Sequence, residues 1–249
     1  MCRHLAYLGP STTLADLLLT PPHSLLRQSW APRRQRYGIV NADGFGAGWY
    51  VPGRPEPVRY RRAQPIWSDA SFGSLAPTVS SGCILAAVRS ATPGFGPDES
   101  CAAPFTERRW LFSHNGRLTD WPAARKALTD RTFDIAEAAA PMDSALLFGL
   151  AAGRWLAGAS LAAGLLDTVR AAQAAGGGRL TLLATDGTRI AGICVGEPMF
   201  VLERGGAVVV ASEPYDDDPR WNELPDHAVV EADLAGVTVT PFDDFLEHR

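Results

Sequence analysis

The chain begins with MCRHLAYLG (residues 1–9), in which a cysteine stands directly after the first methionine and an apolar run follows. Removal of Met1 would give Cys2 both a thiol and a free α-amino group. Such an amine, with an ordinary pKa of about 7.7–8.0, can accept the thiol proton near neutral pH. An N-terminal cysteine is therefore a nucleophile with its own base. The alternative is that Cys2 only starts a buried strand, because free cysteine is among the most buried residue types.

The composition is that of a globular protein with a substantial core. The 249 residues are 46% hydrophobic and 20% charged, and we expect one domain over residues 1–249. No stretch approaches the roughly 18 uninterrupted apolar residues of a membrane span, and no signal segment precedes Cys2. These features predict a cytoplasmic protein.

The formal net charge of −4 argues against a nucleic-acid partner, which requires a concentrated basic footprint. The one basic cluster, RRQR (residues 33–36), is typical of a small-anion site or a solvated turn. We therefore expect a small-molecule partner, while the oligomeric state is left open. The four cysteines are far apart and form no C-x-x-C pair, so neither a zinc site nor a disulfide framework is indicated.

Predicted strands occupy both ends of the chain, with a helical block between them. Periodicity and turn signals predict strands over residues 2–9, 44–50, 58–62, 83–89, 110–113, 180–185, 190–195, 199–202, 207–211, 228–231 and 237–240. They predict helices over residues 12–19, 68–75, 121–128, 144–153 and 161–174. This order favours an α+β protein with layered antiparallel sheets and helices outside them.

Four local motifs follow one another along the chain: Cys2, VRSAT (88–92), HNG (114–116) and MDS (142–144). Their order and content resemble the class II glutamine amidotransferase domain, and the resemblance covers almost the whole chain. It implies an N-terminal-nucleophile hydrolase, a four-layer αββα sandwich with two mainly antiparallel sheets. In that family the processed cysteine attacks a γ-glutamyl carbonyl and forms a thioester that water later releases. Cys2 matches the nucleophile, and no metal or organic cofactor is implied.

The HNG motif matches the family's oxyanion site. The resemblance assigns the stabilisation of the oxyanion to the side chain of Asn115 and the backbone N–H of Gly116, and His114 is expected to shape this turn. Taken by itself, Asn-Gly is better explained as a tight turn that ends the preceding strand, because it is a favoured hairpin pair. A Cys/His dyad with His4 or His114 is a weaker alternative, because the N-terminal amine already supplies a base.

The other two motifs match the family residues that hold the glutamyl group. Arg89 corresponds to the arginine that binds the α-carboxylate, and Thr92 in the same motif is a further candidate for substrate binding. Asp143 corresponds to the acid that binds the α-ammonium group, although it is also well placed as a helix N-cap. The family often has a histidine two residues before this arginine. Ala87 stands there instead, so no role is transferred to that position.

Four further stretches, SWAPRRQ (29–35), NADG (41–44), SDASF (68–72) and ASEPYDDD (211–218), are similar to the amidohydrolases of ergothioneine biosynthesis. That similarity implies removal of glutamate from γ-glutamyl-hercynylcysteine sulfoxide, whose leaving group carries a trimethylammonium cation. Aromatic faces and negative charge bind such cations. Candidates are Trp30, Phe45, Trp67, Phe72 and Tyr215, with Asp216 to Asp218 as an acidic rim. The simpler alternative for each is a core or loop position.

Two other functions remain open at this point. A glutaminase subunit would supply ammonia to a separate synthase, and a catalytically silent binding protein would use the same scaffold without turnover. The presence of all the motif residues in one chain disfavours the silent protein.

Overall fold

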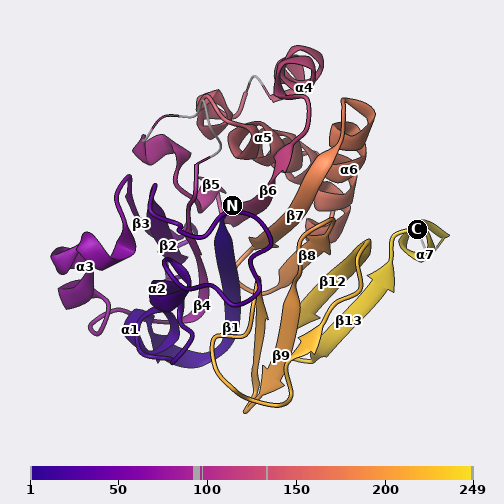
Figure 1. Cartoon of the computed structure of the whole chain (residues 1–249). Helices are drawn as coiled ribbons and strands as arrows, with labels where there is room; N and C mark the ends of the chain where they lie inside the picture. Colours follow the sequence, from indigo (N-terminus) through magenta and orange to yellow (C-terminus); the bar gives the residue numbers. More distant parts are fainter. Residues whose placement is uncertain (1, 92–95, 97, 133, 248–249) are drawn as a thin grey trace.

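The computed structural model describes residues 2–91, 96, 98–132 and 134–247, with side chains to residue 245. Two sheets lie face to face, and every strand pair is antiparallel (Figure 1). The seven-stranded sheet has the order β11 (Asn222–Glu223), β9 (Phe200–Arg204), β10 (Ala207–Ala211), β1 (Arg3–Thr13), β4 (Ser80–Val88), β2 (Phe45–Trp49), β3 (Val58–Arg62). The six-stranded sheet has the order β13 (Gly236–Pro241), β12 (Ala228–Asp233), β8 (Ile190–Cys194), β7 (Gly178–Thr185), β6 (Trp110–Leu118), β5 (Phe105–Glu107).

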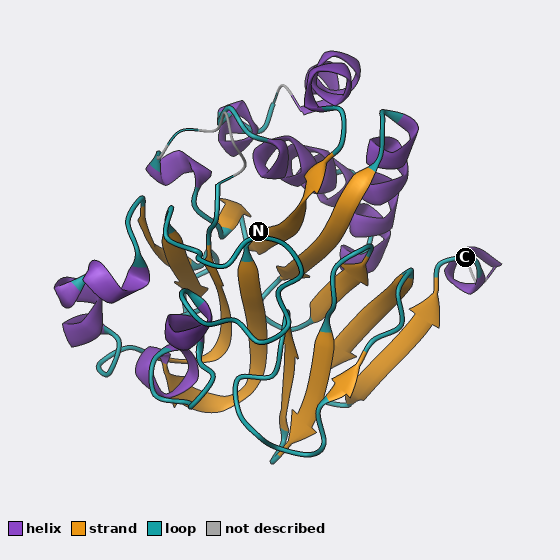
Figure 2. Ribbon diagram, in the orientation of Figure 1, coloured by secondary structure: helices purple, strands orange, loops and turns teal. Residues whose placement is uncertain are grey.

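Helices cover the outer face of each sheet (Figure 2). The seven-stranded sheet carries α1 (Leu14–Leu18), α2 (Leu25–Gln28) and α3 (Ala70–Leu75). The six-stranded sheet carries α5 (Asp143–Leu156) and α6 (Leu161–Ala174), with α4 (Trp121–Leu128) beside them. The remaining described elements are α7 (Asp244–Glu247) and the 3-10 turns Ile66–Ser68, Glu99–Cys101, Thr129–Thr132 and Ala136–Ala139. The predicted αββα layering is confirmed.

Alternation along β1 shows why the layers form. Leu5 and Tyr7 belong to the apolar cluster beneath α1 to α3, whereas Ala6 and Leu8 belong to the cluster between the two sheets. A strand buried on both faces places successive side chains in different cores. A third cluster joins α5 and α6 to the six-stranded sheet. No helix in the described part of the chain is long and apolar enough to span a membrane.

The main correction to the predicted elements concerns the HNG motif. It is not a turn after residue 113, because β6 continues to Leu118, and Asn115 and Gly116 pair with Thr181 and Leu180 on β7. Long-range pairing overrides the local turn preference of Asn-Gly.

Smaller differences concern the ends of elements. Helix α1 starts at Leu14 and not at Thr12, because β1 runs through Thr13, whose side chain caps the helix by accepting the N–H of Asp16 at 2.9 Å. Strand β4 ends at Val88, so Arg89 lies just beyond it. The sequence patterns missed β5, β11 and α2, all of which are short.

Candidate active site

The N-terminal end of β1 and the C-terminal half of β6 lie at the same edge of the sandwich. Between the sheets, Nδ1 of His4 lies 3.0 Å from Oγ of Ser113. Ala6 and Leu8, which follow His4, and Leu111, which precedes Ser113, belong to the same apolar cluster between the sheets, as expected if the two strand segments run in opposite senses. Because side chains two residues apart share a face of a strand, we expect Cys2 and Asn115 to face the same space, one step beyond the His4–Ser113 contact.

Asn115 is buried without a partner for its side-chain amide. It is 0% exposed, and neither Oδ1 nor Nδ2 makes a hydrogen bond with any described residue. Leaving a buried polar group unpaired costs about 1–3 kcal/mol. An unpaired donor that faces a candidate nucleophile has the properties required for stabilising an oxyanion.

Gly116 has no room for a side chain. A Cβ atom there would lie 1.9 Å from the carbonyl oxygen of Arg179 and 2.6 Å from Nε2 of His114. The close approach of β7 therefore requires glycine at this position.

His114 links β6, β7 and α5. Its Nδ1 lies 2.9 Å from Oγ of Ser144, and its Nε2 lies 3.0 Å from the carbonyl oxygen of Arg179. Since a carbonyl only accepts, Nε2 donates, and Nδ1 of the neutral ring accepts from the hydroxyl. Burial lowers the pKa of His114, which favours this neutral form. Both ring nitrogens are thus occupied, which leaves neither of them to pair with Cys2.

His4 is also held neutral. Burial, followed by the charge of Arg3, lowers its pKa to about 3. A group with so low a pKa is a weak general base at neutral pH. Neither histidine at this edge is therefore as suitable a base as an α-amine.

Arg89 lies beside Cys2, because β1 and β4 are neighbouring strands and the last residue of β4 pairs with the first residue of β1. Its side chain is buried, and Nη1 donates to the carbonyl oxygens of Asp43 at 3.1 Å and Gly96 at 3.3 Å. Its Nε makes no hydrogen bond with a described residue. The guanidinium is thus held at the edge of the site, and its Nε–H group can still donate a hydrogen bond to a ligand. Thr92 lies outside the described residues.

Asp143 is the first residue of α5 and contacts the end of β6. Oδ1 accepts the N–H of Ser144 at 2.8 Å, and Oδ2 accepts the N–H of Leu118 at 3.1 Å. The alternative assignment of Asp143 as the helix N-cap is wrong, because the cap position is Met142. The carboxylate instead joins the helix to the strand. A carboxylate has more than two acceptor positions, so these bonds leave capacity for a ligand.

A buried charge cluster next to Cys2 was not predicted. The side chain of Arg3 is 0% exposed, and its Nε donates to the carbonyl oxygen of Cys2 at 2.9 Å. Its terminal nitrogens lie 3.8 Å from the buried carboxylates of Glu197 and Glu213, and Nε of Arg179 lies 3.0 Å from Glu197. Buried charges require such compensation. The cluster fixes the backbone of the candidate nucleophile.

The aromatic candidates separate into two groups. Phe45, Phe72 and Tyr215 are wrong as open-site residues, because all three are buried in the core beneath α1 to α3. Trp30 and Trp67 are 36% and 45% exposed and meet edge to face, with ring centroids 5.7 Å apart. Of the five candidates, these two are the exposed ones.

The proposed acidic rim is largely neutralised by the protein itself. Asp216 and Asp218 lie 2.9 and 3.1 Å from Nη1 of Arg204, and Asp218 also pairs with Arg220. Asp217 pairs with His23 at 2.9 Å. The triplet therefore connects neighbouring loops, and of its three carboxylates only that of Asp217 is largely exposed.

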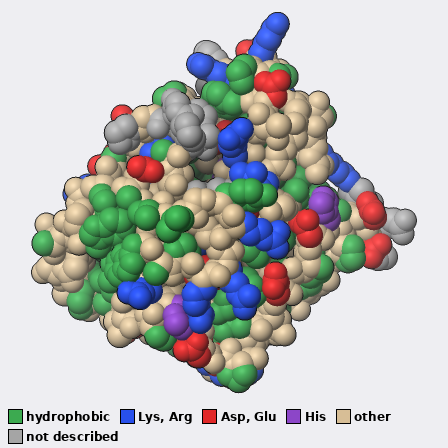
Figure 3. Space-filling view, viewed as in Figure 1, with side chains coloured by type: hydrophobic (Ala, Val, Ile, Leu, Met, Phe, Trp, Pro, Cys, Tyr) green, Lys and Arg blue, Asp and Glu red, His purple; other side chains and the backbone are tan. Residues whose placement is uncertain are grey.

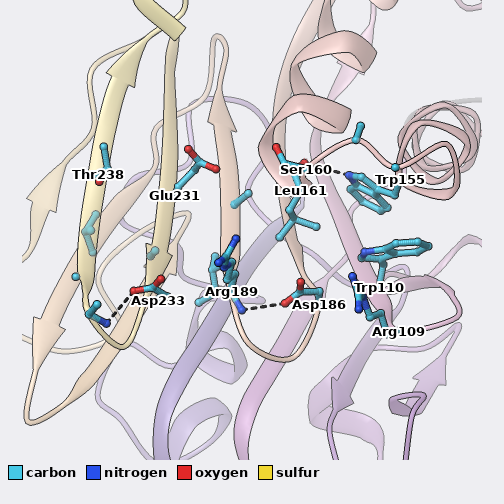
Figure 4. A pocket seen from close by; sticks show the side chains of 18 residues that line it. Arg109, Trp110, Trp155, Ser160, Leu161, Asp186, Arg189, Glu231, Asp233 and Thr238 are labelled. Carbon is cyan, nitrogen blue, oxygen red and sulfur yellow. Dashed lines mark hydrogen bonds between the residues drawn. The ribbon is translucent and has the colours of Figure 1, made fainter. Parts of the chain in front are cut away.

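A cavity of about 710 Å³ lies elsewhere (Figure 4). Its lining includes Trp110 at the start of β6 and Asp186 in the turn after β7. Trp110 is at the opposite end of β6 from Asn115, roughly 16 Å away along an extended strand. None of the described residues predicted for the site lines this cavity.

Comparison with known proteins identifies the family. The chain is 45% identical over 244 residues to the γ-glutamyl-hercynylcysteine sulfoxide hydrolase of Mycolicibacterium smegmatis, covering 97% of this chain and 100% of the relative. The chain belongs to this family of hydrolases. The hydrolase of the same name from Mycobacterium tuberculosis is 42% identical over 246 residues, 98% of this chain and 97% of the relative. No family model matches the chain.

Solved structures place the hydrolase family on the class II glutamine amidotransferase fold. The glutamine aminotransferase class-II domain protein from Silicibacter pomeroyi has a TM-score of 0.69 at 26% identity, over 97% of this chain and 99% of that one. Glutamine phosphoribosylpyrophosphate amidotransferase from B. subtilis has a TM-score of 0.67 at 16% identity, over 97% of this chain and 49% of that one. The second comparison is evidence of a shared fold alone. Together with the antiparallel sheets, they confirm the predicted fold class.

Proposed function

We propose that this hydrolase cleaves the γ-glutamyl amide of γ-glutamyl-hercynylcysteine sulfoxide to glutamate and hercynylcysteine sulfoxide. The observation that carries the proposal is the 45% identity to a hydrolase of that name over the full length of the relative. The reaction type is supported by the His4–Ser113 contact, which brings together the two strands that lead to Cys2 and Asn115.

The proposed first half-reaction forms a thioester. With Met1 removed, the Cys2 amine takes the thiol proton as sulfur attacks the γ-carbonyl carbon. Asn115 Nδ2 and the N–H of Gly116 stabilise the oxyanion of the tetrahedral intermediate. The ammonium then gives its proton to the departing amine nitrogen, and the C–N bond breaks.

The proposed second half-reaction returns the enzyme to its starting state. The neutral amine activates a water molecule, which attacks the thioester carbonyl and releases glutamate and the thiol. Arg89 holds the α-carboxylate of the glutamyl group and Asp143 its α-ammonium throughout. Charged pairs of this kind orient the carbonyl toward the nucleophile, which is where much of the rate enhancement arises.

The setting we propose is cytoplasmic, with residues 1–249 acting as one catalytic domain. All four cysteines are free, as is usual in a reducing compartment.

A side-by-side assay tests the proposed substrate. Glutamate release from γ-glutamyl-hercynylcysteine sulfoxide is expected to exceed release from glutamine by at least about 100-fold in kcat/KM, because only the larger substrate offers additional binding groups. Both substrates are assayed with the same N-terminally processed preparation, at equal enzyme concentration. Preference for glutamine, with turnover that rises when a synthase is added, would favour the ammonia-supplying subunit instead.

A further inference from the structure

The order of the strands gives the site two sides. In the seven-stranded sheet, β1 lies between β4 and β10. Arg89 follows β4, whereas Glu213 lies two residues after β10. If Arg89 holds the α-carboxylate of the glutamyl group, the scissile carbonyl lies at Cys2. The leaving group then extends toward the β10 side.

A series of side-chain contacts leads from the nucleophile toward the β10 side of the site. Arg3 donates to the Cys2 carbonyl and lies 3.8 Å from Glu197, and Glu197 lies 3.0 Å from Arg179. The guanidinium carbon of Arg179 lies 4.2 Å from the ring centroid of Tyr37. Tyr37 is 52% exposed, so about half of its surface is open to a ligand.

The loop between α2 and β2 is fixed over this side. The buried carboxylate of Glu213 accepts the backbone N–H groups of Arg33 at 3.0 Å and Arg34 at 2.8 Å. At its far end, the N–H of Asn41 bonds to the carbonyl of Ser29 at 2.7 Å. Figure 1 shows this loop passing across the N-terminal end of β1. The basic run of residues 33–36 thus borders the site.

The arginines of the loop differ in what they already bind. Arg33 donates to Asp217 at 3.3 Å and to the carbonyl of Pro214. Arg36 is exposed and makes no ion pair or side-chain hydrogen bond with any described residue. It directly precedes Tyr37, whose ring lies 4.2 Å from the guanidinium carbon of Arg179. In agreement with this position, the charge of Arg36 lowers the pKa of Glu197, which burial raises. Figure 3 shows several Lys and Arg side chains gathered near the middle of this face. Arg36 therefore has unused donors close to the charge cluster.

The leaving group of the proposed substrate has matching chemistry. Hercynylcysteine sulfoxide carries two carboxylates and a planar imidazole ring, none of which is present in the ammonia released from glutamine. Arginine binds carboxylates through paired N–H donors, and an exposed aromatic ring can cover a planar one. We propose that Arg36, Arg179 and Tyr37 form the leaving-group subsite, in which the arginines bind the carboxylates and Tyr37 packs on the imidazole. This inference rests on the proposed function.

Substrate preference in two variants tests the subsite. For Arg36→Gln, the ratio of kcat/KM for γ-glutamyl-hercynylcysteine sulfoxide to kcat/KM for glutamine is expected to fall about 10- to 100-fold, the usual effect of losing a charge-assisted contact. For Tyr37→Ala, the same ratio is expected to fall about 2- to 10-fold, the usual effect of losing an aromatic packing contact. The matched control is Arg33→Gln, in the same loop, which is expected to leave the ratio unchanged. Calorimetry with hercynylcysteine sulfoxide alone is expected to show weaker binding to Arg36→Gln.

The outcomes separate the subsite from the function. If wild type hydrolyses the sulfoxide substrate, and both variants keep the wild-type ratio of kcat/KM for the sulfoxide to kcat/KM for glutamine, the proposed subsite is overturned. The proposed function then stands. Equal losses on both substrates, with unchanged product binding, would likewise overturn it, since these residues would then act only through the fold. If wild type releases glutamate from glutamine but not from the sulfoxide, the proposed function fails and the subsite fails with it.

Discussion

Replacing Cys2 with alanine is expected to lower the kcat for glutamate release by at least about 10⁴-fold, the scale seen when a covalent nucleophile is removed. The alanine chain keeps its amine but has no atom that can form the thioester. Glutamate release is measured by coupled assay on N-terminally processed protein. Unfolding temperatures are compared to show that the fold is retained.

Cys83 provides a matched control for this loss. It is a buried thiol whose Sγ lies 3.2 Å from Oγ1 of Thr185, and burial raises its pKa to about 12. Cys83 pairs with Leu8, several residues along β1 from Cys2. Cys83→Ala is therefore expected to retain turnover. Substantial activity in Cys2→Ala, or its loss in both variants alike, would contradict the assignment of the nucleophile.

Replacing Asn115 with alanine is expected to lower kcat about 10²- to 10³-fold with little change in KM, because the lost donor acts on the oxyanion and not on the bound substrate. The stability of Asn115→Ala is not expected to fall with its activity. Since the amide makes no hydrogen bond with a described residue, the substitution breaks no such bond and removes an unpaired buried group. The melting temperature is therefore expected to stay level or rise.

This combination of effects is specific to a residue kept for catalysis. Steady-state kinetics and thermal unfolding of the same Asn115→Ala preparation provide both readouts. A fall in kcat accompanied by a clear fall in melting temperature would indicate a structural role. An unchanged kcat would remove Asn115 from the proposed mechanism.

Local periodicity predicted several elements well. Val58–Arg62 and Leu161–Ala174 have the same bounds in the structure as in the sequence analysis, since strand alternation and helix-forming composition are strong there. Asn115-Gly116 shows the limit of such reasoning, because the turn preference is local and the pairing with β7 is not. That strand pairing places the unpaired amide in the site.

The buried charge cluster lay beyond sequence reasoning for a similar reason. Arg3, Arg179, Glu197 and Glu213 come from distant parts of the chain, and only the sandwich brings them together. One signal was available, namely an arginine at the start of a strand whose next residues, Leu5 to Leu8, form an apolar run, since a buried arginine requires a partner. The motif residues could be named because they match the family. Their common edge follows from the opposed β1 and β6.

Mass spectrometry of the working enzyme tests the central claim most directly. Protein quenched during turnover of γ-glutamyl-hercynylcysteine sulfoxide is digested, and its N-terminal peptide is analysed. The account predicts that this peptide begins at Cys2 and carries one glutamyl group on sulfur, which hydroxylamine removes. A fully active preparation that retains Met1, or a glutamyl group on another residue, would contradict it.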